Sequence, residues 1–226
     1  MQIVRLVTIA ASVTFGILLT QPANAQSPLE TQAHDHAPVV LAAATADQSE
    51  VDATKAVLRD LWIGHVFWVR NVVVAQLAGD AAAQDAAEVQ VVANAQAIAA
   101  SIEPFYGADA RAQFFELLAG HYGAVKAYLD ASVAGDTGEQ SDATAMLLGN
   151  ATGIADFLST ANPYLPKDAV EGLLQAHGGH HIAQIQQLLG KEYLEEARTW
   201  TEMTQHMYVI ADATADALAQ QFAERF

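Results

Sequence analysis

The phrase LLAGH at residues 117–121 has counterparts at equal intervals on either side, LWIGH at 61–65 and LLQAH at 173–177. Each phrase ends in a histidine. Around the first of them, apolar residues recur every three or four positions, which is the spacing of one face of an α-helix. A phrase that returns at a fixed interval, here about 56 residues, is typical of a chain built from repeated structural units. The sequence therefore predicts three related units of this length.

A second polar residue follows each repeated histidine at one constant distance and stands in a largely apolar segment. These residues are Asn94, Asn150 and His206. Turn-like phrases lie near each midpoint, AGD at 78–80, AGD at 134–136 and LGK at 189–191. In an antiparallel helical hairpin, residues equidistant from the turn lie at the same height, here about 20 Å from it at 1.5 Å per residue. Each unit is thus predicted to be one hairpin with two polar residues facing each other.

The breaks in the apolar pattern predict six helices and no strand. Alanine, leucine and glutamine, which favour helices, dominate the segments between the breaks. The expected helices span 51–78, 81–103, 109–134, 139–160, 167–189 and 192–223. The predicted fold class is all-α, a six-helix bundle of three repeated antiparallel hairpins that forms one domain over 51–226.

The N-terminal segment is typical of a secretory signal peptide. A short start with Arg5 precedes the apolar run LVTIAASVTFGILL, and ANA follows at 23–25. This order predicts a signal peptide over 1–25, because the run is too short for a typical membrane span. Residues 26–50 have no sustained period and are interpreted as a flexible tail. We expect an exported protein, periplasmic or secreted, without stable membrane insertion after cleavage.

Charge and cysteine content exclude several classes of function. Removal of the one basic residue in the signal segment leaves nine basic and 26 acidic residues, a formal charge of −17. Nucleic acids and anionic lipids are bound by positive surfaces, so neither is an expected partner. The chain contains no cysteine, which excludes disulfides and thiolate metal sites. The sequence gives no indication of a protein partner.

If the three hairpins pack the same way up, the repeated polar residues form one layer at mid-height. An unpaired buried imidazole or amide costs about 1–3 kcal/mol, so the layer must be paired. In one interpretation each histidine donates to its asparagine and the layer only sets helix register, as a buried asparagine does in coiled coils. In the other, the imidazoles bind a transition metal such as zinc or copper, or a small polar ligand. The candidate metal ligands are His65, His121, His177 and His206, with Asn94 and Asn150 as further binding residues.

The phrase HGGHH at 177–181 adds histidines that the repeat does not require. His177 and His181 are one helical turn apart, a spacing that permits metal chelation. The alternative is an exposed histidine-rich turn. No HExxH, GxSxG, phosphate-binding loop or Glu-x-x-His pair is present, so nothing in the sequence argues for an enzyme.

Several of these phrases resemble a family of small, exported, helical bacterial proteins. LWIGHVFWVR at 61–70 is similar to the family's LWxxHxxWxR opening phrase, and MYVIADATADALAQQF at 207–222 to its closing ADxL-like helix. The resemblance covers nearly all of residues 58–222. It implies a helical fold with repeated polar positions and no established activity, and HGGHH departs from the usual pattern.

Overall fold

The computed structural model describes residues 45–226. The expected signal peptide over 1–25 and the expected tail up to residue 44 lie outside the described residues. The described part is almost entirely helical, and its elements are α1 (Gln48–Ala78), α2 (Ala81–Ser101), α3 (Glu103–Ala134), α4 (Thr137–Ala161), α5 (Lys167–Leu189), α6 (Tyr193–Gln221) and a short 3-10 turn, η1 (Ala223–Arg225). The predicted all-α six-helix bundle is confirmed.

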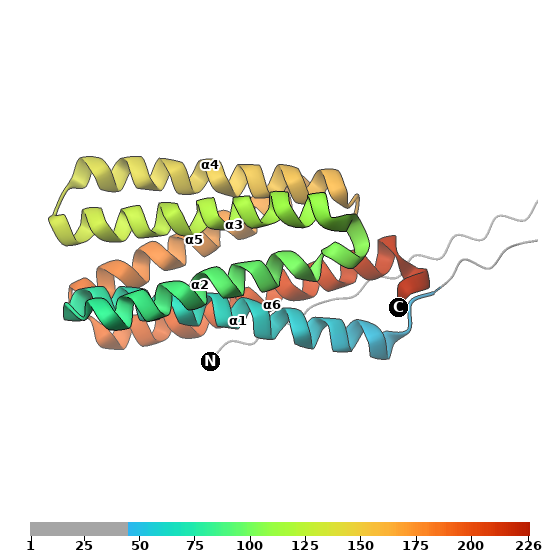
Figure 1. Ribbon diagram of the computed structural model, residues 1–226, viewed down its shortest axis with the longest axis horizontal. Coiled ribbons are helices and arrows are strands. Elements are labelled where there is room, and N and C mark those ends of the chain that lie inside the picture. Colours follow the sequence, from blue (N-terminus) through green and yellow to red (C-terminus); the bar gives the residue numbers. More distant parts are fainter. Residues whose placement is uncertain (1–44) are drawn as a thin grey trace, which may run out of the picture. The chain divides into compact units, whose positions relative to one another are not determined.

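The six helices run along the length of the bundle as three hairpins (Figure 1), and their contacts close into a ring. Each helix packs on the helices before and after it in the chain, and α6 packs on α1 to close the ring. The first helices of the hairpins, α1, α3 and α5, also contact one another. Helix α1 is long and apolar enough to cross a membrane by length and composition alone. Here it packs on four other helices, so its apolar face contributes to the core.

The first two hairpins turn in the same way. Gly79 and Gly135 both adopt φ 71° and ψ 20°, a left-handed conformation that glycine reaches without steric cost and that ends α1 and α3. The next residue in each case, Asp80 or Asp136, accepts hydrogen bonds from backbone amides at the start of the following helix. The third turn differs, because Lys191 rather than a glycine has positive φ there.

Helix boundaries follow the predicted ones closely, with two local differences. Helix α1 begins at Gln48, slightly earlier than the expected residue 51, because Asp47 caps it and accepts from the amide of Ser49 at 2.8 Å. The predicted break over 104–108 is narrower than expected. The chain is helical from Glu103 onward, apart from Gly107 (φ 85°, ψ 176°), where the axis kinks.

A polar layer divides the apolar core into two clusters. On α5, Leu174 belongs to one cluster and Ile185 to the other, while His177 and His181 lie between them and are buried. Helix α3 shows the same order around its own buried histidine, His121. The histidines are therefore enclosed by packed hydrophobic side chains toward both ends of the bundle.

Candidate metal centre

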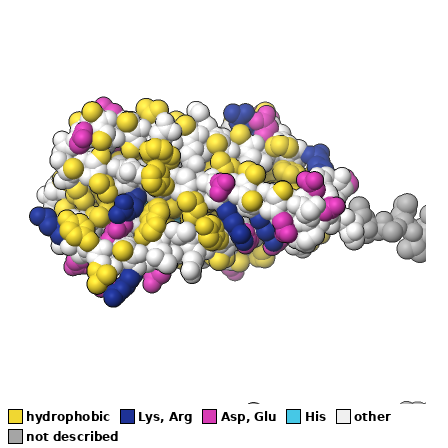
Figure 2. Space-filling view, turned by 90° about the horizontal axis from the view of Figure 1, so that it is seen from below, with side chains coloured by type: hydrophobic (Ala, Val, Ile, Leu, Met, Phe, Trp, Pro, Cys, Tyr) yellow, Lys and Arg dark blue, Asp and Glu magenta, His cyan; other side chains and the backbone are white. Residues whose placement is uncertain are grey.

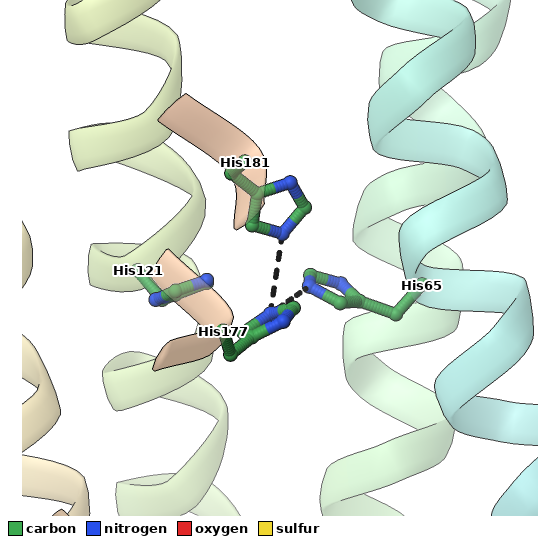
Figure 3. A group of neighbouring side chains, drawn as sticks. All are labelled: His65, His121, His177 and His181. Carbon is green, nitrogen blue, oxygen red and sulfur yellow. Dashed lines mark hydrogen bonds between the residues drawn. The ribbon is translucent and has the colours of Figure 1, made fainter. Parts of the chain in front are cut away.

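Four histidines meet where α1, α3 and α5, the first helices of the three hairpins, contact one another. His65 comes from α1, His121 from α3, and His177 and His181 from successive turns of α5 (Figure 3). Their exposed fractions are only 4%, 4%, 1% and 3%. Of the described residues, no histidine is visible on the face drawn in Figure 2, although acidic and basic side chains are. We call this group the histidine tetrad.

The tetrad is compact in every direction. All six distances between ring centroids fall between 4.5 Å and 5.8 Å. One nitrogen from each ring can be chosen so that all four lie within 4.8 Å of one another. Four points at nearly equal mutual distances form a tetrahedron, so the rings surround one central position instead of stacking in a row.

The ring nitrogens are not satisfied by one another. His177 Nε2 lies 3.4 Å from His65 Nε2 and 3.2 Å from His181 Nε2. An imidazole nitrogen has one in-plane site, which holds either a proton or a lone pair, so His177 Nε2 cannot make two good hydrogen bonds there. His121 Nε2 is buried and has no hydrogen-bond partner. The tetrad therefore brings together nitrogens that lack adequate partners within the protein.

All four imidazoles are held in the neutral form. Burial lowers the pKa of His65 to about 3, and His121 lowers it further. Burial also lowers the pKa of His121 to about 4, partly opposed by the side chain of Asn150. The pKa values of His177 and His181 lie well below 6.5, through burial and through the other histidines. A neutral imidazole carries the free lone pair that a metal ion requires.

The side-chain amides of Asn94 and Asn150 donate to backbone carbonyl groups. Asn94 Nδ2 donates to the carbonyl oxygen of Leu61 at 2.9 Å, and Asn150 Nδ2 donates to that of Leu117 at 2.9 Å. Each carbonyl lies one helical turn before a tetrad histidine. The Oδ1 atoms of both asparagines are buried and have no hydrogen-bond partner. The asparagines therefore fix the helical turn that leads into the histidine.

His206 makes the same contact in the third hairpin and lies outside the tetrad. Its Nε2 is 2.8 Å from the carbonyl oxygen of Leu173. Its ring lies beside His180, with centroids 5.3 Å apart. His206 was the fourth candidate metal ligand predicted from the sequence. In the structure, His181 lies beside His65, His121 and His177 in its place.

The repeat itself contained a signal for His181. One repeat interval before His181 stands Val125, two intervals before it stands Val69, and all three residues are buried. A position that holds core valine in two units and histidine in the third places an imidazole in the core. The interpretation of HGGHH as an exposed turn is wrong, because the phrase lies inside α5 with His177, Gly178 and His181 buried.

Close packing of α4 on α5 explains why the phrase HGGHH has a glycine at position 178. A Cβ atom at this position would lie 2.8 Å from Cδ2 of Leu147 on α4, closer than real contacts allow. The glycine thus lets α4 and α5 approach each other between His177 and His181. Gly179 has no neighbour within 4 Å of such an atom, so no packing contact requires it.

A buried carboxylate could also contribute to a metal site, but the one present among the described residues already accepts hydrogen bonds from other side chains. Among the described residues, Glu196 on α6 is the one acidic side chain that is buried. Its two oxygens accept from Arg70 Nε at 2.6 Å and Nη2 at 2.9 Å, and Gln184 Nε2 also donates to it. This network joins α1, α5 and α6. The tetrad consequently offers four nitrogens and no oxygen to an ion.

Comparisons with known protein families, with curated proteins and with solved structures returned no match.

Proposed function

We propose that this protein binds one transition metal ion, zinc or copper, through His65, His121, His177 and His181. The observation that carries the proposal is the set of six nearly equal ring distances, 4.5–5.8 Å, around one buried centre. The apolar signal-like start at residues 1–25 supports placing this function outside the cytoplasm.

The ring spacing and the two nitrogen separations at His177 agree with tetrahedral coordination, and the four ligand nitrogens, which lie within 4.8 Å of one another, would draw closer around an ion. An ion about 2.0–2.1 Å from each nitrogen would hold the four nitrogens about 3.3–3.4 Å apart and the ring centroids about 5 Å apart. The two Nε2 separations at His177 are 3.4 Å and 3.2 Å. Imidazole suits zinc, copper, iron and nickel, whereas calcium and magnesium prefer oxygen. The ligand set thus favours a transition metal over the hard cations.

A shell of four protein nitrogens favours holding an ion over catalysis. Catalytic zinc sites use three protein ligands and keep the fourth position for water or substrate, while structural sites are closed by four. All four positions of a tetrahedral ion would be filled by the tetrad here. The proposed role is therefore binding or storage of the ion, with added stability for the bundle.

Metal addition to the chelator-treated, tag-free full chain tests the proposal. His34 and His36 in the N-terminal segment should first be changed to glutamine so that they cannot bind the ion. At a free metal concentration of a hundred times Kd, binding stabilises the folded state by about 2.7 kcal/mol. For a domain of this size, the melting temperature should then rise by roughly 5–10 °C. Zinc, copper and nickel are compared separately, and the bound metal is counted by elemental analysis.

His181→Val is the diagnostic variant, because valine occupies the corresponding positions 69 and 125 in the core. It should lower metal affinity sharply while the protein stays folded. His206→Asn is the matched control and should retain the melting shift. If no ion raises the melting temperature of the parent chain, the metal proposal fails and the layer serves helix register. If His206→Asn abolishes the shift and His181→Val does not, the ligand assignment is wrong.

A further inference from the structure

A second pair of histidines, His180 and His206, lies beside the tetrad and is partly exposed. Their rings approach to 5.3 Å between centroids at an angle of 60°, and they come from adjacent helices, α5 and α6. His180 directly precedes the ligand His181. His206 contacts the carbonyl of Leu173, one helical turn before the ligand His177. The pair thus adjoins both α5 ligands from the solvent side.

Both histidines of the pair have an unused ring nitrogen. The backbone carbonyl of Leu173 can only accept, so His206 Nε2 carries the proton and donates to it. The Nδ1 atom of a neutral His206 then carries the lone pair. His180 Nδ1 is buried and has no hydrogen-bond partner. The two imidazoles therefore have nitrogens free to bind an ion.

The hydrogen bond to the backbone does not require a histidine at position 206. Asn94 and Asn150 make the same bond to the corresponding carbonyls at 2.9 Å with their amides. His180 likewise stands where the repeat interval places Ala124 and Trp68 in the other units. The third hairpin thus departs from the other two at both positions, and both departures bring an imidazole to the same place.

We propose that His180 and His206 form an outer capture site that receives the transition metal ion from solvent and passes it to the histidine tetrad. This inference rests on the proposed metal function of the tetrad. The tetrad is almost fully buried, so an ion needs intermediate ligands or a local opening to reach it. The formal charge of −16 favours the approach of cations to the molecule as a whole, and the exposed Glu202, one turn before His206 on α6, adds a negative charge near the pair.

Stopped-flow measurement of cobalt uptake by the chelator-treated full chain tests the capture site, because cobalt bound by four nitrogens absorbs visible light. The variant His206→Asn keeps an amide for the Leu173 carbonyl, as in the other hairpins, and removes the imidazole. His180→Gln removes the other ligand. Each variant should slow uptake by about tenfold or more, the lower end of the gain that local ion capture gives to association rates. Equilibrium affinity should change by a small factor, because the tetrad is intact.

Uptake at the parent rate in both variants overturns the capture site and leaves the tetrad proposal standing. Loss of equilibrium binding in His206→Asn also overturns it, since the pair would then be part of the final ion site. If the parent chain binds no cobalt, zinc or copper at equilibrium, the capture site fails together with the proposed function. Slow uptake with unchanged affinity is the one result that supports a capture site.

Discussion

Lowering the pH from about 7.5 to about 5.5 should strongly destabilise the metal-free protein. In the unfolded chain the histidines bind protons as the pH falls through about 6.5. In the folded protein, burial holds the pKa of His65 at about 3 and that of His121 at about 4, with His177 and His181 also well below 6.5. The unfolded state thus binds more protons in this window, so the free energy of unfolding falls as the pH falls.

The magnitude follows from the number of buried imidazoles. Between these two pH values, each histidine that stays neutral in the folded state costs about 1.4 kcal/mol of stability. Four such residues cost on the order of 5 kcal/mol, against a typical total stability of roughly 5–15 kcal/mol. Ordinary carboxylates, with a pKa of about 3.9–4.3 in the unfolded chain, remain ionised in this window and contribute little.

Urea unfolding of the chelator-treated protein, followed by circular dichroism at both pH values, measures this loss. The variant His181→Val should reduce the difference between the two pH values by about 1.4 kcal/mol, one histidine's share. An equal free energy of unfolding at the two pH values would refute the reasoning, because it would mean that the tetrad takes up protons while folded. Saturating metal should steepen the loss, since protons compete with the ion for the same nitrogens.

Gly178→Ala should destabilise the protein by about 1–3 kcal/mol, because the new Cβ atom would lie 2.8 Å from Leu147. Gly179→Ala should stabilise it by up to about 1 kcal/mol, because no atom lies within 4 Å of the new Cβ and alanine favours the helix over glycine. Urea unfolding of the two variants side by side checks this, and equal effects would contradict the packing argument. Arg70→Met should cost about 3 kcal/mol because Glu196 keeps a buried charge without its partner, and adding Glu196→Gln should restore most of that loss. A double variant no more stable than the single one in thermal unfolding would show that the charge is not the cause.

The sequence by itself determined the fold class and the height of the polar layer. Helical periodicity is a local property, and glycine and aspartate at the turns carry their backbone preferences with them, as Gly79 and Gly135 show. The constant repeat interval placed His65, His121 and His177 at matching points of three hairpins. Once hairpins pack side by side, matching points meet, and the structure brings these three residues together.

Only the tertiary structure decided which side of each helix faces the centre. His206 and His181 belong to different helices at similar heights, and height along a helix does not specify direction around its axis. The contact of α5 with α1 and α3 turns His181 inward. The contact of α6 with α5 and α1 instead directs His206 to a backbone carbonyl oxygen. The other two hairpins have an asparagine at the corresponding position. Packing angles arise from all the side chains between helices, so the repeat could place an imidazole in the core at position 181, but only the assembled bundle shows that it faces the other three.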